Sequence, residues 1–179
     1  MIMQYTTTYQ SPLGSITLAS NGESLTGLWF AGQKYYGETL SAEHEEKDLS
    51  VFSQTRSWLD CYFRGEDPSF TPPLYLHSSP FRLEVWEILK QIPYGKVMTY
   101  GAIADIMARQ RGMKTISAQA VGGAVGHNPI SIIIPCHRVV GSSGSLTGYA
   151  GGIDKKVRLL TLEHVDMKYL IIPENGTAL

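Results

Sequence analysis

Pro135-Cys136-His137-Arg138-Val139 is the stretch of sequence on which the interpretation of the rest depends. It follows the apolar, β-branched run at residues 131–134, which predicts a buried strand, and it precedes the Gly/Ser-rich segment 141–144, which predicts a loop. This order places a cysteine at the end of a rigid element with a histidine beside it. Because the thiolate is the nucleophilic form of cysteine, a nearby base or positive charge would have to lower the pKa of Cys136.

Cys136 has two interpretations at this point. Free cysteines are usually buried and act as small hydrophobic side chains, whereas the adjacent histidine and the flanking glycines favour a nucleophile. Consecutive residues of a strand point to opposite faces, so His137 can reach Cys136 only if the strand breaks there or a water joins them. The other cysteine, Cys61, falls inside a predicted helix, where a core position is the simpler interpretation.

Length and composition indicate a packed protein of one large or two small domains. The chain has 179 residues, of which 43% are hydrophobic. Its apolar stretches are far shorter than the ~18 residues of a membrane span, and no secretory signal opens it. Two widely spaced cysteines give neither a disulfide framework nor a zinc spacing, which favours a reducing, cytoplasmic location.

Charge is distributed unequally along the chain. Residues 1–79 carry 4 basic and 9 acidic side chains, whereas residues 80–179 carry 11 basic and 7 acidic ones. The net charge of the whole chain is −1 and does not by itself indicate a nucleic-acid partner. The basic second half suggests contact with a polyanion, but on charge alone an ordinary solvated surface is the favoured interpretation.

The first half predicts a small antiparallel sheet followed by one helix. Three strands separated by turn signals are predicted at residues 4–9, 15–19 and 25–31. The polar segment 34–47 predicts a solvated loop, and Asp48 can cap a helix that ends at Gly65. Residues 66–78 contain three prolines and no periodicity, so they predict a linker between domains 1–78 and 79–179.

The second half predicts helices with a small β wing. The first helix is expected to begin at Pro80, with Ser79 as its cap. Three further helices are expected at Thr99–Arg109, Ser117–Gly126 and Ile153–Glu163. A short strand is expected at residues 139–140. The second and third of these helices resemble a helix-turn-helix, a pattern that many non-binding helix pairs share. Gly122 and Gly123 cost the third helix stability, so close approach by another backbone is a plausible compensation.

Three motifs, in this order and spacing, resemble those of the O6-alkylguanine-DNA alkyltransferases. They are Asn128-Pro129-Ile130, Pro135-Cys136-His137-Arg138-Val139 and Gly148-Tyr149-Ala150-Gly151-Gly152. The similarity covers residues 80–165 and, more loosely, the first half. It implies an α/β (α+β) protein with a ribonuclease-H-like small α/β domain and a helical, winged-helix or helix-turn-helix-like domain.

The resemblance implies irreversible, single-use transfer of an alkyl group from O6-alkylguanine, and also from O4-alkylthymine, in double-stranded DNA to the protein's own cysteine, without a cofactor. Cys136 resembles the nucleophile, His137 the base that acts through a water, and Glu163 the acid that orients the histidine. Asn128 resembles a residue that braces the turn. Tyr100, Tyr149, Val139 and Ala150 resemble the pocket of the flipped base, with Tyr149 stacking on it and donating toward O6. Arg138 is expected to be a structural ion-pair partner, and both tyrosines have wall packing as their alternative.

The small residues of the third helix resemble a recognition helix that enters the minor groove. The residues assigned to DNA contact are Ala118, Gln119, Ala120 and Gly123. Most family members place an arginine where this chain has Gln119, so weaker base flipping is expected. For Lys155, Lys156 and Arg158, a solvated face and a phosphate contact are both open. The lone Cys61 cannot build the zinc site of some family members, so no metal is expected, and the protein is expected to be a monomer.

Two other functions remain open from the sequence. An alkyltransferase-like lesion sensor would bind the flipped base without repairing it, but such proteins lack the cysteine that this chain has at Cys136. A cysteine hydrolase built on Cys136 and His137 would turn over many times. Incubation with alkylated DNA separates all three, because only repair gives a single stoichiometric alkylation of the cysteine.

Overall fold

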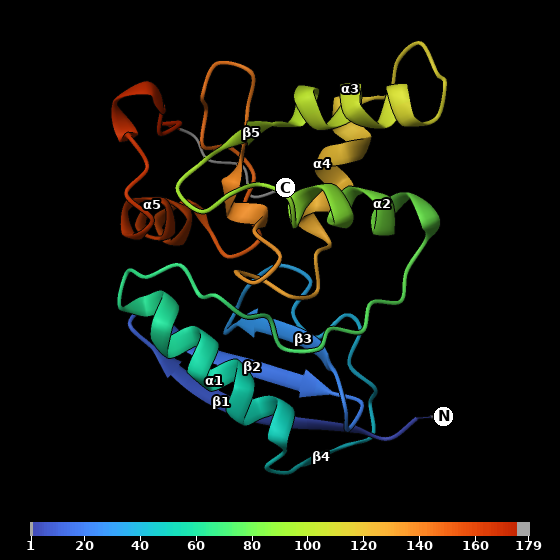
Figure 1. Cartoon of the computed structure of the whole chain (residues 1–179), viewed down its shortest axis with the longest axis vertical. Coiled ribbons are helices and arrows are strands. Elements are labelled where there is room, and N and C mark those ends of the chain that lie inside the picture. The colour runs from blue at the N-terminus through green and yellow to red at the C-terminus, as the bar shows by residue number, and fades with distance from the viewer. Residues whose placement is uncertain (1, 175–179) are drawn as a thin grey trace. The chain divides into compact units, whose positions relative to one another are not determined.

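The structure, a computed structural model, describes residues 2–174 and consists of two compact units (Figure 1). The first unit comprises the chain through Leu76 together with Pro129–Ile133, and the second comprises His77–Asn128 and the chain from Ile134 onward. The short segment Pro129–Ile133 therefore belongs to the first unit although the sequence around it belongs to the second. No helix among the described residues is long and apolar enough to cross a membrane.

A four-stranded sheet forms the first unit. Strands β1 (Gln4–Ser11), β2 (Gly14–Ser20) and β3 (Leu25–Phe30) pair in antiparallel order, which confirms the predicted meander. Strand β4 (His44–Glu46) pairs in parallel with β1, so the prediction of a loop over residues 34–47 was wrong at its end. All three residues of β4 are exposed, which explains why no apolar alternation indicated a strand there.

Helix α1 (Ser50–Phe63) packs on this sheet through Phe52, Leu59 and Tyr62, which are fully buried. Asp48 does not cap the helix: Leu49 occupies the N-cap position, and the Asp48 carboxylate accepts a hydrogen bond from Arg56 instead.

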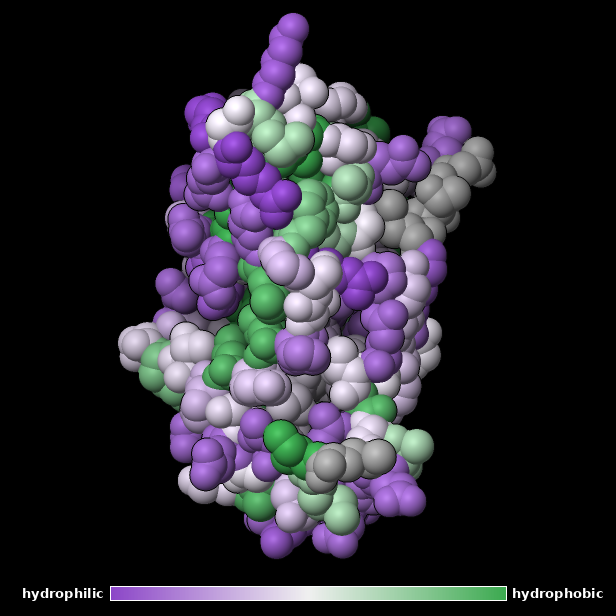
Figure 2. Space-filling model, turned by 90° about the vertical axis from the view of Figure 1, so that its right-hand side faces the viewer, coloured by the Kyte–Doolittle hydropathy of each residue, from purple (hydrophilic) through white to green (hydrophobic). Residues whose placement is uncertain are grey.

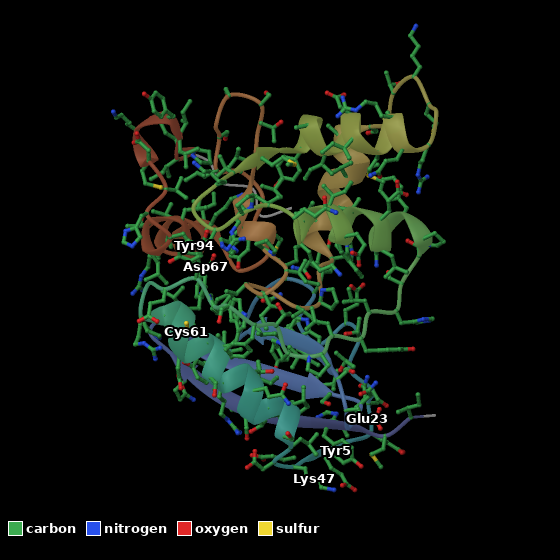
Figure 3. The ribbon with its side chains drawn as sticks, viewed as in Figure 1. Tyr5, Glu23, Lys47, Cys61, Asp67 and Tyr94 are labelled. Carbon is green, nitrogen blue, oxygen red and sulfur yellow. The ribbon has the colours of Figure 1, made fainter. Side chains whose placement is uncertain are left out.

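Figure 3 labels Cys61, for which the sequence predicted a core position, and also Lys47 and Tyr5, whose side chains neighbour each other. Cys61 on α1 is half-buried with its thiol 3.6 Å from Glu66, so the prediction of a core position was wrong. Lys47 places its Nζ 5.0 Å from the centroid of the Tyr5 ring.

Helices α2 (Pro80–Leu89), α3 (Tyr100–Gln110) and α4 (Ala118–Gly126) form most of the second unit. Each begins where the sequence predicted, and the side chains of Ser79, Thr99 and Ser117 accept hydrogen bonds from the backbone of the first turn. The indole of Trp86 on α2 donates to the carbonyl of Ala124 on α4, at 2.8 Å. Helices α3 and α4, the pair predicted to resemble a helix-turn-helix, pack against each other.

Strands β5 (Met98–Thr99) and β6 (Val139–Val140) form a two-stranded parallel sheet, which confirms the short strand predicted at residues 139–140. Helix α5 (Ile153–Leu162) follows, with Leu159 and Leu160 buried. On the face drawn in Figure 2, hydrophilic side chains predominate and hydrophobic ones reach the surface in smaller groups.

The predicted strand at residues 131–134 does not exist. The segment is a series of tight turns in which Ile132 has a φ of +69° and the amide of Ile133 donates to the carbonyl of Ser131. Ile130 forms an isolated bridge with Leu28 and is not part of a named strand. The run is apolar because most of it is buried, and burial alone does not distinguish a strand from a buried turn.

Candidate active site

Cys136 lies in a one-turn 3-10 helix (Cys136–Arg138) directly before β6. The amide of Cys136 donates to the carbonyl of Ile134, and the amide of Arg138 donates to that of Pro135. A turn therefore stands where the sequence predicted a strand end, and the alternation of side chains along a strand does not apply to Cys136 and His137. Cys136 is 4% exposed and His137 is fully buried.

Asn128 braces this turn. Its side-chain amide donates to the carbonyl of Ile134 at 2.8 Å, and it also forms a hydrogen bond with Cys136. Asn128 is 4% exposed and directly follows the C-cap residue of α4, so the end of α4 is tied to the turn that carries the thiol.

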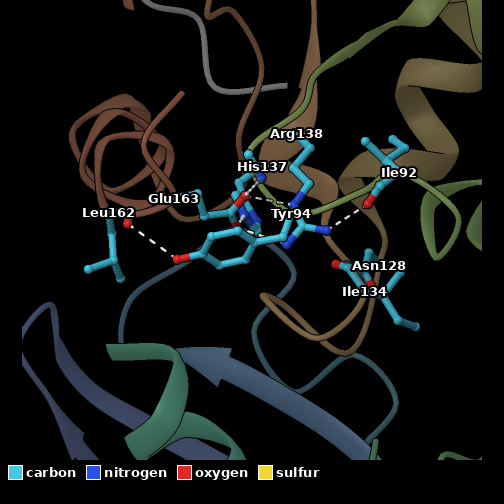
Figure 4. A network of polar contacts seen from close by, with 9 residues as sticks. Ile92, Tyr94, Asn128, Ile134, His137, Arg138, Leu162 and Glu163 are labelled. Atoms are coloured by element: carbon cyan, nitrogen blue, oxygen red, sulfur yellow. Dashed lines mark hydrogen bonds and ion pairs between the residues drawn. The ribbon is translucent and has the colours of Figure 1, made fainter. Parts of the chain in front are cut away.

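His137, Arg138 and Glu163 form a buried charged network (Figure 4). His137 Nε2 lies 2.5 Å from Glu163 Oε1, and Arg138 binds both carboxylate oxygens, with Nε 2.8 Å from Oε2 and Nη2 3.0 Å from Oε1. The amide of Gly95 donates to Oε2 at 3.1 Å, and Arg138 Nη1 donates to the carbonyl of Ile92. The carboxylate is thus held by a bidentate guanidinium, a ring nitrogen and a backbone amide.

The network fixes the protonation of its members. Burial alone would raise the pKa of Glu163, but the hydrogen bonds and charges of His137 and Arg138 outweigh burial and lower it to about 2. An ionised carboxylate can only accept, so Nε2 of His137 carries the proton that it donates to Glu163. In the neutral ring the basic nitrogen is then Nδ1, which suits His137 to act as a base.

Cys136 is held as a thiol in this state. Burial raises its pKa, against the hydrogen bond from Asn128, the positive charge of Lys156 and the amides of residues 136 and 137. These groups would stabilise a thiolate, so proton removal by a base has a prepared environment.

Lys156 corrects a prediction. The sequence left open a solvated face or a phosphate contact, but Lys156 on α5 is fully buried. Its Nζ donates to the carbonyl of Val139 at 2.5 Å and to that of Thr147 at 3.3 Å. Burial lowers its pKa to about 8, and the neighbouring Cys136 partly offsets this. Lys156 is the site residue that the sequence reasoning missed.

Of the predicted pocket residues, Tyr100 and Tyr149 lie close enough to Cys136 to interact with it electrostatically. The hydroxyl of Tyr100 on α3 donates to the carbonyls of Thr147 and Gly148, at 3.3 and 3.0 Å. Tyr149 is 2% exposed, and its hydroxyl has no hydrogen-bond partner among the described residues. Burial raises the pKa of both tyrosines, and the proximity of Cys136 adds to this. The Val139 carbonyl is bound by Lys156, and Ala150 is half-buried.

The predicted recognition residues form an exposed face of α4, outside the buried network: Ala118, Gln119, Ala120 and Gly123. A side chain added at Gly123 would meet no protein atom within 4 Å, and one added at Gly122 would touch only the Tyr100 ring, at 3.8 Å. Close packing against another backbone of this chain, which the sequence suggested, therefore does not explain these glycines.

Acid should destabilise the protein in two stages. Burial lowers the pKa of His137 below its ordinary 6.5, so the folded state resists protonation and loses stability as the pH falls through 6.5. The pKa of Glu163 is lowered from 4.5 to about 2, so its contribution, about 3 kcal/mol at full ionisation, is lost as the pH falls from about 4.5 to 2. Urea unfolding at successive pH values tests this, and a midpoint that rises on acidification would contradict it.

No group of three or more His, Cys, Asp or Glu side chains that could hold a metal ion occurs among residues 2–174.

Comparison with known proteins gives two matching family models. The one described as 6-O-methylguanine DNA methyltransferase, ribonuclease-like domain, matches residues 4–76. The one described as 6-O-methylguanine DNA methyltransferase, DNA binding domain, matches residues 80–165.

Relatives of similar length resemble this chain in sequence, and one solved structure resembles it in fold. A methylated-DNA–protein-cysteine methyltransferase of Mycobacterium bovis is 46% identical over 87% of this chain and 90% of its own length. One of Haemophilus influenzae is 40% identical over 92% and 89%. A crystal structure of Mycobacterium tuberculosis OGT in complex with DNA has a TM-score of 0.76 and 44% identity, covering 89% of this chain and 92% of that one.

Proposed function

The chain belongs to the 6-O-methylguanine DNA methyltransferase family, and we propose that it repairs duplex DNA by transferring the alkyl group of O6-alkylguanine to Cys136. The observation that carries the residue assignment is the buried turn in which Cys136 stands beside the His137–Glu163 pair. A nucleophile, a base and a group that orients the base are the components that activate a thiol.

The transfer begins with the thiol proton. His137 Nδ1 takes it through a water, and Glu163 stabilises the imidazolium through the hydrogen bond at Nε2. The Cys136 thiolate then attacks the alkyl carbon, a C–S bond forms, and the C–O6 bond breaks with its electron pair passing to the guanine. Tyr149 donates toward O6 as negative charge develops there. Because water does not cleave the thioether that forms on Cys136, each protein molecule acts once.

Guanine must leave the helix for O6 to reach a buried thiol. The carbonyls of Cys136 and Val139 would accept from its exocyclic amino group, with Tyr100, Tyr149 and Ala150 lining the pocket. The exposed small residues of α4 suit close approach to a narrow groove, and the open space at Gly123 supports an outside partner for this face. Gln119 would contact the base left unpaired.

Incubation with duplex DNA that contains O6-methylguanine tests this function. One methyl group per protein, located on Cys136 by peptide mass spectrometry, is expected, together with an equal amount of restored guanine. Cys136→Ser should bind the DNA without accepting the group. Binding without methylation of the wild type would favour a lesion sensor, and repeated turnover would favour a hydrolase.

Four finer assignments are part of the proposal. O4-alkylthymine is a second substrate, tested with the same assay on a duplex carrying that base. The protein acts as a monomer in the cytoplasm, which sedimentation with and without DNA and cell fractionation would check. Its domains along the sequence are residues 1–78 and 79–179, of which Pro129–Ile133 packs within the first compact unit.

Replacing Gln119 with Arg should tighten binding to damaged duplex about fivefold, because a guanidinium adds charge and stacks on bases, a contact of about 1 kcal/mol or more. Fluorescence anisotropy at fixed ionic strength measures this, with Gln119→Met as the uncharged control. Equal affinity of the arginine variant and the wild type would remove Gln119 from the DNA interface.

Replacing Gly123 with Gln should stabilise the fold yet weaken DNA binding. A helix gains about 0.5–1 kcal/mol when an interior glycine is replaced, and no protein atom obstructs a side chain here. The added bulk would hold α4 away from the groove. Thermal unfolding and DNA titration should therefore move in opposite directions, while Thr161→Gln on the exposed face of α5 should leave affinity unchanged.

A further inference from the structure

The last helical turn and the residues after it, Met167–Ile171, are here called the tail segment. Its end pairs with the loop at residues 141–148, here called the pocket loop. The amide of Ile171 donates to the carbonyl of Gly144, and the amide of Leu146 donates to the carbonyl of Ile171, both at 2.9 Å. Ser145 and Ile171 form a parallel bridge. The end of the tail segment is thus joined to the pocket loop by an isolated bridge and two backbone hydrogen bonds.

Packing supports the same pairing. Leu146 of the pocket loop lies in a small hydrophobic cluster with Val140 and Leu160, against which Met167 and Leu170 of the tail segment pack. Gly144 has a φ of +80°, and a Cβ built there would lie only 2.3 Å from the Tyr169 carbonyl oxygen. A glycine is therefore required at residue 144 by the close passage of the tail segment.

The pocket loop in turn supplies the carbonyls that order the site. Thr147 accepts from the Tyr100 hydroxyl and from Lys156 Nζ, and Gly148 accepts from Tyr100. Tyr149, the residue assigned to stack on the flipped base, comes next in the chain. Two backbone hydrogen bonds made by Ile171 therefore lie three to five residues from the aromatic ring that receives the base.

We propose that the tail segment is a positioning element for alkyl transfer, with Ile171 acting through its main chain to hold the pocket loop in the geometry that receives the damaged base. This rests on the proposed function. Loss of the two backbone bonds leaves Cys136, His137 and Glu163 in place but lets Tyr149 shift. A displacement of about 1 Å in a reacting complex can cost up to about a hundredfold in rate.

Two variants break the pairing in different ways. Ile171→Pro removes the amide that donates to Gly144, and Gly144→Ala places a methyl group against the Tyr169 carbonyl. The matched control is Ile171→Ala, since this side chain is 54% exposed and alanine keeps the amide. Each protein is mixed in excess with duplex containing O6-methylguanine, and the first-order rate of methylation is measured at saturating protein, together with affinity for undamaged duplex.

Both pairing variants should methylate at least about tenfold more slowly than Ile171→Ala, with affinity for undamaged duplex within twofold of the wild type. Hydrogen exchange at the amide of Leu146 should accelerate in both, whereas that of buried α5 amides should not. If Ile171→Pro fails to fold, Gly144→Ala decides. If all variants are methylated at the same rate, the role of the tail segment is overturned and the proposed function is not affected. If the wild type accepts no methyl group, the proposed function itself is overturned.

Discussion

Replacing Glu163 with Gln is expected to slow alkyl transfer at saturating DNA by about a hundredfold or more, the range that a general base contributes. The amide keeps the shape of the side chain but removes the charge that stabilises the imidazolium of His137, 2.5 Å away. The side-chain amide of the variant can still accept a hydrogen bond from His137 Nε2, but it carries no negative charge and therefore does not make Nδ1 more basic. Rapid-quench measurement of methylated Cys136 gives the rate, and its pH profile should shift with the pKa of His137.

The same substitution should destabilise the fold by about 3–5 kcal/mol, because it leaves the guanidinium of Arg138, 8% exposed, without its counter-charge. Asp154→Asn on the first turn of α5 removes an exposed carboxylate from the same helix and serves as the control. The low-pH loss of stability between about pH 4.5 and 2 should disappear from the Glu163 variant alone. A variant that transfers methyl at the wild-type rate would exclude Glu163 from the reaction.

Local signals in the sequence were sufficient for the helices. Ser79 and Thr99 combine a side-chain acceptor with a helix-forming run, and each caps its helix as predicted. Ser117, predicted as the first residue of its helix, is the N-cap residue as well. The same rule failed at Asp48, because an alternative partner, Arg56, binds its carboxylate. A cap is a competition between the backbone amides and other donors, and a distant donor is not visible in the local sequence.

The turn before Cys136 could not be predicted from its composition. Isoleucines disfavour a positive φ, yet Ile132 adopts +69° where the chain passes from one compact unit to the other. Tertiary packing therefore overrides the β propensity of the run. Strand β4 was missed for the opposite reason, since its residues are all exposed and polar and only pairing with β1 defines it.

The position of Lys156 was available in the sequence. Lys156, Leu159, Leu160 and Glu163 recur at the i, i+3, i+4, i+7 spacing of a buried helical stripe, and all four are buried. A lysine on such a stripe must find acceptors inside the protein. Its charge suggested a surface position, whereas its spacing indicated the interior, and the spacing was the better guide.

Replacing Lys156 with Met should lower the free energy of unfolding at pH 7 by no more than about 3 kcal/mol. The variant loses charge-assisted hydrogen bonds to two carbonyls, worth about 1.5–3 kcal/mol each, but also loses the cost of burying an ammonium. A pKa lowered from 10.5 to about 8 corresponds to about 3 kcal/mol of such cost. The two effects oppose each other and leave a net loss of about 0–3 kcal/mol, which the fold should tolerate with a side chain of similar volume.

Alkyl transfer, in contrast, should fall at least about tenfold in Lys156→Met, because the carbonyls of Val139 and Thr147 lose the donor that holds them and Cys136 loses a nearby positive charge. Stability should also lose its pH dependence above neutrality. In the wild type the unfolded lysine keeps its proton up to about pH 10.5 and the folded one only to about 8, so stability rises between these values. Lys155→Met, one residue away and half-buried, is the matched control. A Lys156 variant with full transfer activity and an unchanged rise in stability would show that its ammonium neither shapes the site nor titrates there.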